Sequence, residues 1–134
     1  MLPVTSDDVR LFLHVLAATV WVGGQLVVLA LVAPLRAAGP DVPGVAARRF
    51  AVVAWPAFLV LVATGVWNLL DVPVTDASTE YQVTLAVKLG VVAISGVAAW
   101  VHGRARTPAT RAISGAIALL AALAALLLGV VLRG

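Results

Sequence analysis

Residues 84–103 read TLAVKLGVVAISGVAAWVHG and are almost entirely apolar, yet they include Lys88, Ser95 and His102. A helix needs about 20 mostly apolar residues to cross a hydrocarbon core of about 30 Å. This stretch has that length and carries a lysine that a purely lipid-facing helix would not keep. It therefore predicts a membrane-spanning helix with a polar face.

The rest of the chain repeats this pattern. Of the 134 residues, 63% are hydrophobic and only 11% are charged, whereas soluble domains have about 25% charged residues. Apolar blocks predict helices over about 9–33, 49–70, 80–103 and 111–132. Because the connections are short, consecutive helices should be antiparallel neighbours. We predict an all-α integral membrane protein, an up-down four-helix bundle that forms a single domain over 1–134.

Several other classes of protein do not fit the sequence. The segment before the first block holds Asp7 and Asp8 but lacks the basic n-region of a signal peptide, so we expect the first block to be retained. The chain has no cysteine, which excludes disulfides and thiolate metal sites. The positions of the basic residues indicate membrane orientation, and no nucleic-acid partner is expected.

Charge asymmetry predicts the orientation. Two of the three predicted loops carry arginines: Arg36, Arg48, Arg49, Arg104, Arg106 and Arg111. The middle loop has Asp71, Asp76 and Glu80 instead. By the positive-inside rule, both arginine loops should be cytoplasmic and both termini outside, in the plasma (inner) membrane.

The last predicted helix has a face of small residues. Ala118, Ala122, Ala125 and Gly129 recur at spacings of four, three and four. Small residues let helices approach closely in lipid. The face could serve packing within the chain or a homodimer contact.

A polar stripe runs along the third predicted helix. Tyr81, Lys88, Ser95 and His102 are seven residues apart, and Thr84 lies one turn from Lys88. Lys88 should lie about 10 Å inside the outer boundary. A lysine near mid-helix costs roughly 2.5 to 3.5 kcal/mol on insertion, so it should face the bundle interior or a wet cavity. The alternative is that its long side chain snorkels to the interface.

The first two helices supply possible partners. His14, Trp21 and Gln25 share one face of the first helix, and Thr64 and Asn68 lie one turn apart on the second. We expect a group of these polar residues to converge in the outer half of the bundle: His14, Thr64, Asn68, Thr84 and Lys88. His14 could be a ligand, or its ring could simply be hydrogen-bonded to a neighbouring helix.

The two histidines cannot share an iron within one protomer. His14 lies near the outer end of its helix and His102 near the cytoplasmic end, so their axial separation is on the order of 20 Å. We interpret His102 as an interfacial residue. A haem would therefore use His14 with an open position, with water, or with Lys88 as the neutral amine.

Four motifs together resemble the copper resistance protein D (CopD) domain family, near the HemJ-like membrane protoporphyrinogen oxidases. They are HVLAATVWVGG (14–24), RRF (48–50), ATGVWNLL (63–70) and YQVTLAVKLG (81–90). The resemblance implies a multi-helix inner-membrane protein associated with copper uptake or resistance. HemJ-like proteins bind b-type haem, and their essential His and Lys pair is similar to His14 and Lys88.

Three hypotheses follow, and whether the protein is an enzyme stays open. The first is a b-type haem in the outer half, used for redox or electron transfer. His14 and Lys88 would be its metal ligands, or Lys88 a propionate partner, with a wall of Trp21, Gln25, Asn68, Thr64 and Thr84. The second is a copper uptake or resistance component using the same cavity. The third is a non-catalytic membrane partner whose polar stripe fixes helix register.

Overall fold

A computed structural model describes residues 2–134, which form helices and turns with no strand. Four helical segments of this part of the chain are long and apolar enough to cross a membrane: Ser6–Ala38, Val42–Asp71, Thr79–Arg104 and Pro108–Val131. The predicted all-α fold with four spans is confirmed. The chain divides into two compact units, one ending at Val72 and the other comprising Pro73–Gly134.

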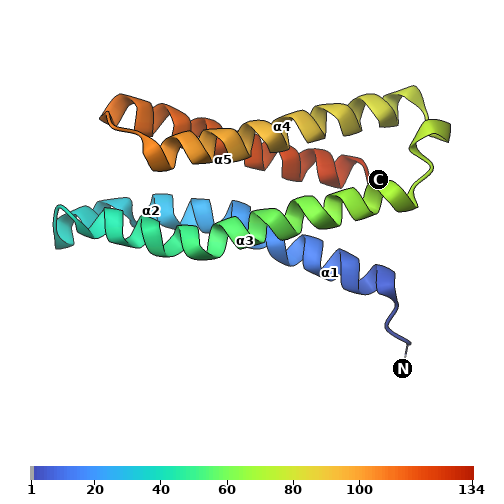
Figure 1. Cartoon of the computed structure of the whole chain (residues 1–134), viewed down its shortest axis with the longest axis horizontal. Coiled ribbons are helices and arrows are strands. Elements are labelled where there is room, and N and C mark those ends of the chain that lie inside the picture. Colours follow the sequence, from blue (N-terminus) through green and yellow to red (C-terminus); the bar gives the residue numbers. More distant parts are fainter. Residues whose placement is uncertain (1) are drawn as a thin grey trace. The chain divides into compact units, whose positions relative to one another are not determined.

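The first unit is a pair of antiparallel helical segments (Figure 1). The outgoing segment consists of α1 (Ser6–Ala18), a π-helical turn η1 (Thr19–Gly23) and α2 (Gly24–Ala38). A short turn leads into α3 (Val42–Asp71), which returns alongside α1 and α2. Thr5 and Asp8 form a capping box that satisfies backbone N–H groups at the start of α1.

The second unit is a hairpin of α4 (Thr79–Arg104) and α5 (Pro108–Val131), preceded by the 3-10 turn η2 (Val74–Asp76) (Figure 1). Both helices begin at hydroxyl caps. Ser78 accepts a hydrogen bond from the Tyr81 N–H, and Thr107 accepts one from the Thr110 N–H. Pro108 occupies the start of α5, where its missing N–H would have no helical partner anyway.

The helices extend beyond their apolar cores. The second span was expected to begin at about residue 49, but α3 begins at Val42, and the first span continues to Ala38. Hydropathy identifies only the apolar part of a helix, whereas Arg36, Arg48 and Arg49 lie on helical ends outside the apolar blocks. The single-domain assignment, the packing of the units into one bundle and the positions of the termini stay predictions.

Candidate functional site

The strongest candidate in the first unit is His14 on α1, whose ring is held by Thr64 on α3. His14 Nδ1 lies 2.8 Å from Thr64 Oγ1, and Thr64 is buried, with 5% of its surface exposed. The Thr64 hydroxyl donates its one hydrogen to the Val60 carbonyl at 2.7 Å. It must therefore accept a hydrogen bond from His14 Nδ1–H.

This bond fixes the tautomer of the imidazole. With its proton on Nδ1, the neutral ring carries its lone pair on Nε2. Metal-binding histidines usually donate the other ring N–H to a neighbouring acceptor in this way. The structure thus brings together His14 and Thr64, two of the five residues expected to converge. The contact agrees both with a ligand role and with a histidine that only joins two helices.

A second cluster, which our sequence analysis missed, lies one turn earlier on α1. The Arg10 guanidinium pairs with the Asp71 carboxylate and lies 3.3 Å from Asp7. It also lies 5.7 Å from the centre of the Trp67 ring. The residue spacing could have indicated this cluster. Arg10 precedes His14 by four residues, about one helical turn, and Asp71 follows Thr64 by seven, about two turns. The same two helix faces thus make both contacts.

Trp21 lies in the π-helical turn and is buried, with 4% exposed. Its ring packs on Trp55 and Phe58 of α3, with centroids 5.5 and 4.4 Å away. Gln25 Nε2 donates to the Trp21 carbonyl at 2.9 Å, which helps to satisfy the widened turn. Single π-helical turns often occur at functional sites. Trp55 and Phe58 were not expected from the sequence, because nothing in the hydropathy of α3 distinguishes them.

Asn68 is half-buried on α3, one turn beyond Thr64. This is the position expected from the spacing of four residues. The residue therefore lies on the same side of α3 as the acceptor for His14.

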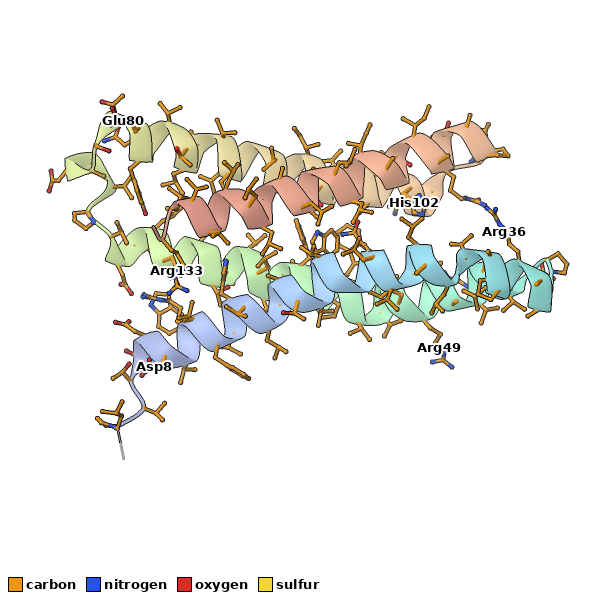
Figure 2. The ribbon with its side chains drawn as sticks, turned by 180° about the vertical axis from the view of Figure 1, so that it is seen from behind. Asp8, Arg36, Arg49, Glu80, His102 and Arg133 are labelled. Atoms are coloured by element: carbon orange, nitrogen blue, oxygen red, sulfur yellow. The ribbon has the colours of Figure 1, made fainter. Side chains whose placement is uncertain are left out.

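In the second unit, the polar stripe of α4 faces α5. The Ser95 hydroxyl donates to the Ala118 carbonyl at 2.8 Å and is 1% exposed. His102 Nδ1 lies 2.7 Å from the Arg111 carbonyl, so this nitrogen must be the donor. Figure 2 shows His102 near the end of α4 that leads to the turn. Both bonds join the two helices of the hairpin.

Lys88 belongs to the same stripe. Its side chain is half-buried and ends beside Gly129, where an added Cβ would lie 3.2 Å from Nζ. Thr84, one turn earlier, donates its hydroxyl hydrogen to the Glu80 carbonyl of its own helix at 2.8 Å. Lys88, Ser95 and His102 of the stripe thus contact α5, and the hydrogen bonds of Ser95 and His102 have a packing role.

The small-residue face of α5 contacts this stripe. Ala118 accepts the Ser95 hydrogen bond, Gly129 lies beside Lys88, and Ala122 is 2% exposed. These contacts match the alternative of packing within the chain. The homodimer stays a prediction.

The candidate residues thus fall into both units. The first contains His14, Trp21, Gln25, Thr64 and Asn68, and the second contains Thr84 and Lys88. Their convergence on one cavity stays a prediction. Within residues 2–134, no three His, Asp or Glu side chains form a group that could hold a metal ion.

Comparison with known proteins identifies the family. The model of the family described as copper resistance protein D matches residues 44–133, two thirds of the chain. The match includes Thr64 and Lys88 and begins after His14. No curated protein and no solved structure matches, and the relation to HemJ-like oxidases stays a prediction. The chain, a multi-pass membrane protein, belongs to the copper resistance protein D family.

Proposed function

We propose that this protein binds a b-type haem through His14 and takes part in redox or electron-transfer chemistry. One observation carries the proposal: the buried Thr64 hydroxyl, already committed to the Val60 carbonyl, holds His14 Nδ1–H at 2.8 Å. The lone pair on Nε2 is thereby oriented. This arrangement is typical of an imidazole that ligates a metal.

The donor set fits haem better than a bare metal ion. Haem iron can be held by one protein imidazole, whereas structural metal sites built from side chains usually need three or four ligands. Residues 2–134 offer no such group. Trp55 and Phe58, which are half-buried and pack on the buried Trp21 ring, supply an apolar surface in the same unit.

The roles of the residues follow from these contacts. A bound haem would supply one-electron chemistry. His14 would hold the iron, and Thr64 would keep the ring in one tautomer and one orientation. Lys88 would be a second ligand of the iron or the partner of a haem propionate. Replacing Lys88 alone tests this role separately.

The Thr64 hydroxyl provides the sharpest test. Thr64→Val removes the acceptor for Nδ1–H while keeping the shape of the side chain. We expect haem affinity, measured by titration of the purified apoprotein, to fall about 10- to 100-fold. Thr19→Val is the matched control, because Thr19 donates to the Val15 carbonyl at 2.8 Å in the same way. Equal affinities in the two variants would argue against the proposed role of Thr64.

Copper handling is the second candidate, and membership of the copper resistance protein D family favours it. Copper(I) prefers thiolate and thioether ligands, but the chain has no cysteine and one methionine. Histidine and neutral lysine nitrogens would have to replace them. This candidate predicts copper-dependent growth or uptake that is lost in His14→Ala and Lys88→Ala at unchanged expression. Normal copper phenotypes in both variants would exclude it.

A further inference from the structure

The turn between α4 and α5 concentrates positive charge. Residues 81–134 contain no Asp or Glu, yet Arg104, Arg106 and Arg111 lie around this turn. Ion pairs in the described part of the chain involve only Arg10. Because the turn joins two helices apolar enough to span a membrane, it should lie at a membrane surface, where anionic groups are available from lipid.

The turn also holds one arginine in a defined position. The Arg104 guanidinium lies 4.1 Å from the centre of the Trp100 ring. Trp100 is 52% exposed, and exposed tryptophans at helix ends favour the level of the lipid headgroups. Arg111 Nη2 donates to the Ala105 carbonyl at 3.0 Å and so tightens the turn. We therefore expect Arg104 to lie at headgroup depth.

An apolar groove continues from the turn along both helices. It consists of two shallow hollows of about 320 and 340 Å³ that share Ala98 and Ile117. The hollow nearer the turn is also lined by Val101, Thr110, Ile113 and Ser114. The hollow farther from the turn is also lined by Ala93, Ile94 and Val97. Over residues 93–101 the groove runs along the helix for about 12 Å. Its lining suits a hydrocarbon chain and not a water-soluble ligand.

We propose that the α4–α5 hairpin binds an anionic glycerophospholipid. The phosphate would interact with Arg104 and Arg106, whose guanidinium groups match phosphate oxygens in charge and geometry. One acyl chain would lie in the groove between Ala98 and Ile117. The site is built within the second unit and does not depend on the proposed haem.

Native mass spectrometry of the detergent-purified full chain tests the headgroup. The probes are palmitoyl-oleoyl phosphatidylglycerol and the phosphatidylcholine with the same acyl chains. We expect the intact protein to retain phosphatidylglycerol in preference to phosphatidylcholine. Arg104→Gln combined with Arg106→Gln should weaken retention about twenty-fivefold, at about fivefold for each arginine near the surface. Arg48→Gln with Arg49→Gln is the charge-matched control and should retain the lipid.

Two further comparisons test the groove. Val97→Trp should fill it and reduce the lipid-bound fraction, whereas Leu120→Trp, at an equally exposed site on α5 outside the groove, should not. Free sn-glycerol 3-phosphate should bind far more weakly than the lipid. The proposal is overturned if phosphatidylcholine binds equally well, if both arginine pairs behave alike, or if the free headgroup binds as tightly as the lipid. Circular dichroism of each variant confirms that it is folded.

Discussion

At the scale of single residues, the hairpin of α4 and α5 depends on what lies opposite each polar side chain. His102 lies over Gly115, where an added Cβ would be 2.8 Å from Nδ1, and Lys88 lies over Gly129, where it would be 3.2 Å from Nζ. The His102 ring is fixed by its bond to the Arg111 carbonyl. The end of Lys88 is flexible and can move. The two glycines should therefore differ in their tolerance of a methyl group.

We predict that Gly115→Ala destabilises the protein and Gly129→Ala does not. At residue 115 the methyl group should cost about 1 to 3 kcal/mol by overpacking. At residue 129 the higher helix propensity of alanine should offset the contact and raise the free energy of unfolding by up to about 1 kcal/mol. Unfolding of both variants by SDS in mixed micelles measures the difference. Equal stabilities would contradict the contacts of His102 described above.

At the scale of helices, the sequence predicts the four spans and the faces of α1, α3 and α4 that carry polar residues. Hydropathy measures burial in lipid, so it locates the apolar cores but misses helical ends such as Val42. Periodicity places His14 and Thr64 on particular faces, but their contact depends on the register of α1 against α3. The π-helical turn and the packing of Trp21 on Phe58 are tertiary effects that leave no periodic signal.

The register of α1 on α3 should depend on Arg10 and Asp71. Arg10 is 13% exposed and Asp71 48% exposed, so their coupling should be modest, about 0.5 to 1 kcal/mol. A double-mutant cycle with Arg10→Gln and Asp71→Asn measures it as a change in the free energy of unfolding. Asp76→Asn, at an acidic residue without an ion pair in the described chain, is the control. Strictly additive effects of Arg10→Gln and Asp71→Asn would contradict a stabilising pair.

At the scale of the whole molecule, the sign of the charge differs between the turns within each unit and the segment that links the two units. Arginines lie around the turns after α2 and after α4, and the linking segment carries Asp71, Asp76 and Glu80. Arg10 does not weaken this asymmetry, because it is paired with Asp7 and Asp71. The positive-inside rule then predicts that both arginine turns are cytoplasmic.

The absence of cysteine from the sequence permits a direct test of this orientation. Single cysteines can be introduced at Ala38, Ala77 and Ala105, which lie next to the three connections between helices. A membrane-impermeant maleimide added to intact cells should label Ala77→Cys only. Ala38→Cys and Ala105→Cys should react after the membrane is opened. Labelling of these two in intact cells would reverse the predicted orientation.

The central claim is that His14 ligates a b-type haem, and an absorption spectrum tests it most directly. The detergent-purified protein from haem-replete cells is measured oxidised and dithionite-reduced, beside His14→Ala and beside His102→Ala as a matched control. We predict a Soret band and reduced α and β bands that weaken in His14→Ala and persist in His102→Ala. A spectrum without these bands in the intact protein, or bands unchanged by His14→Ala, would contradict the claim.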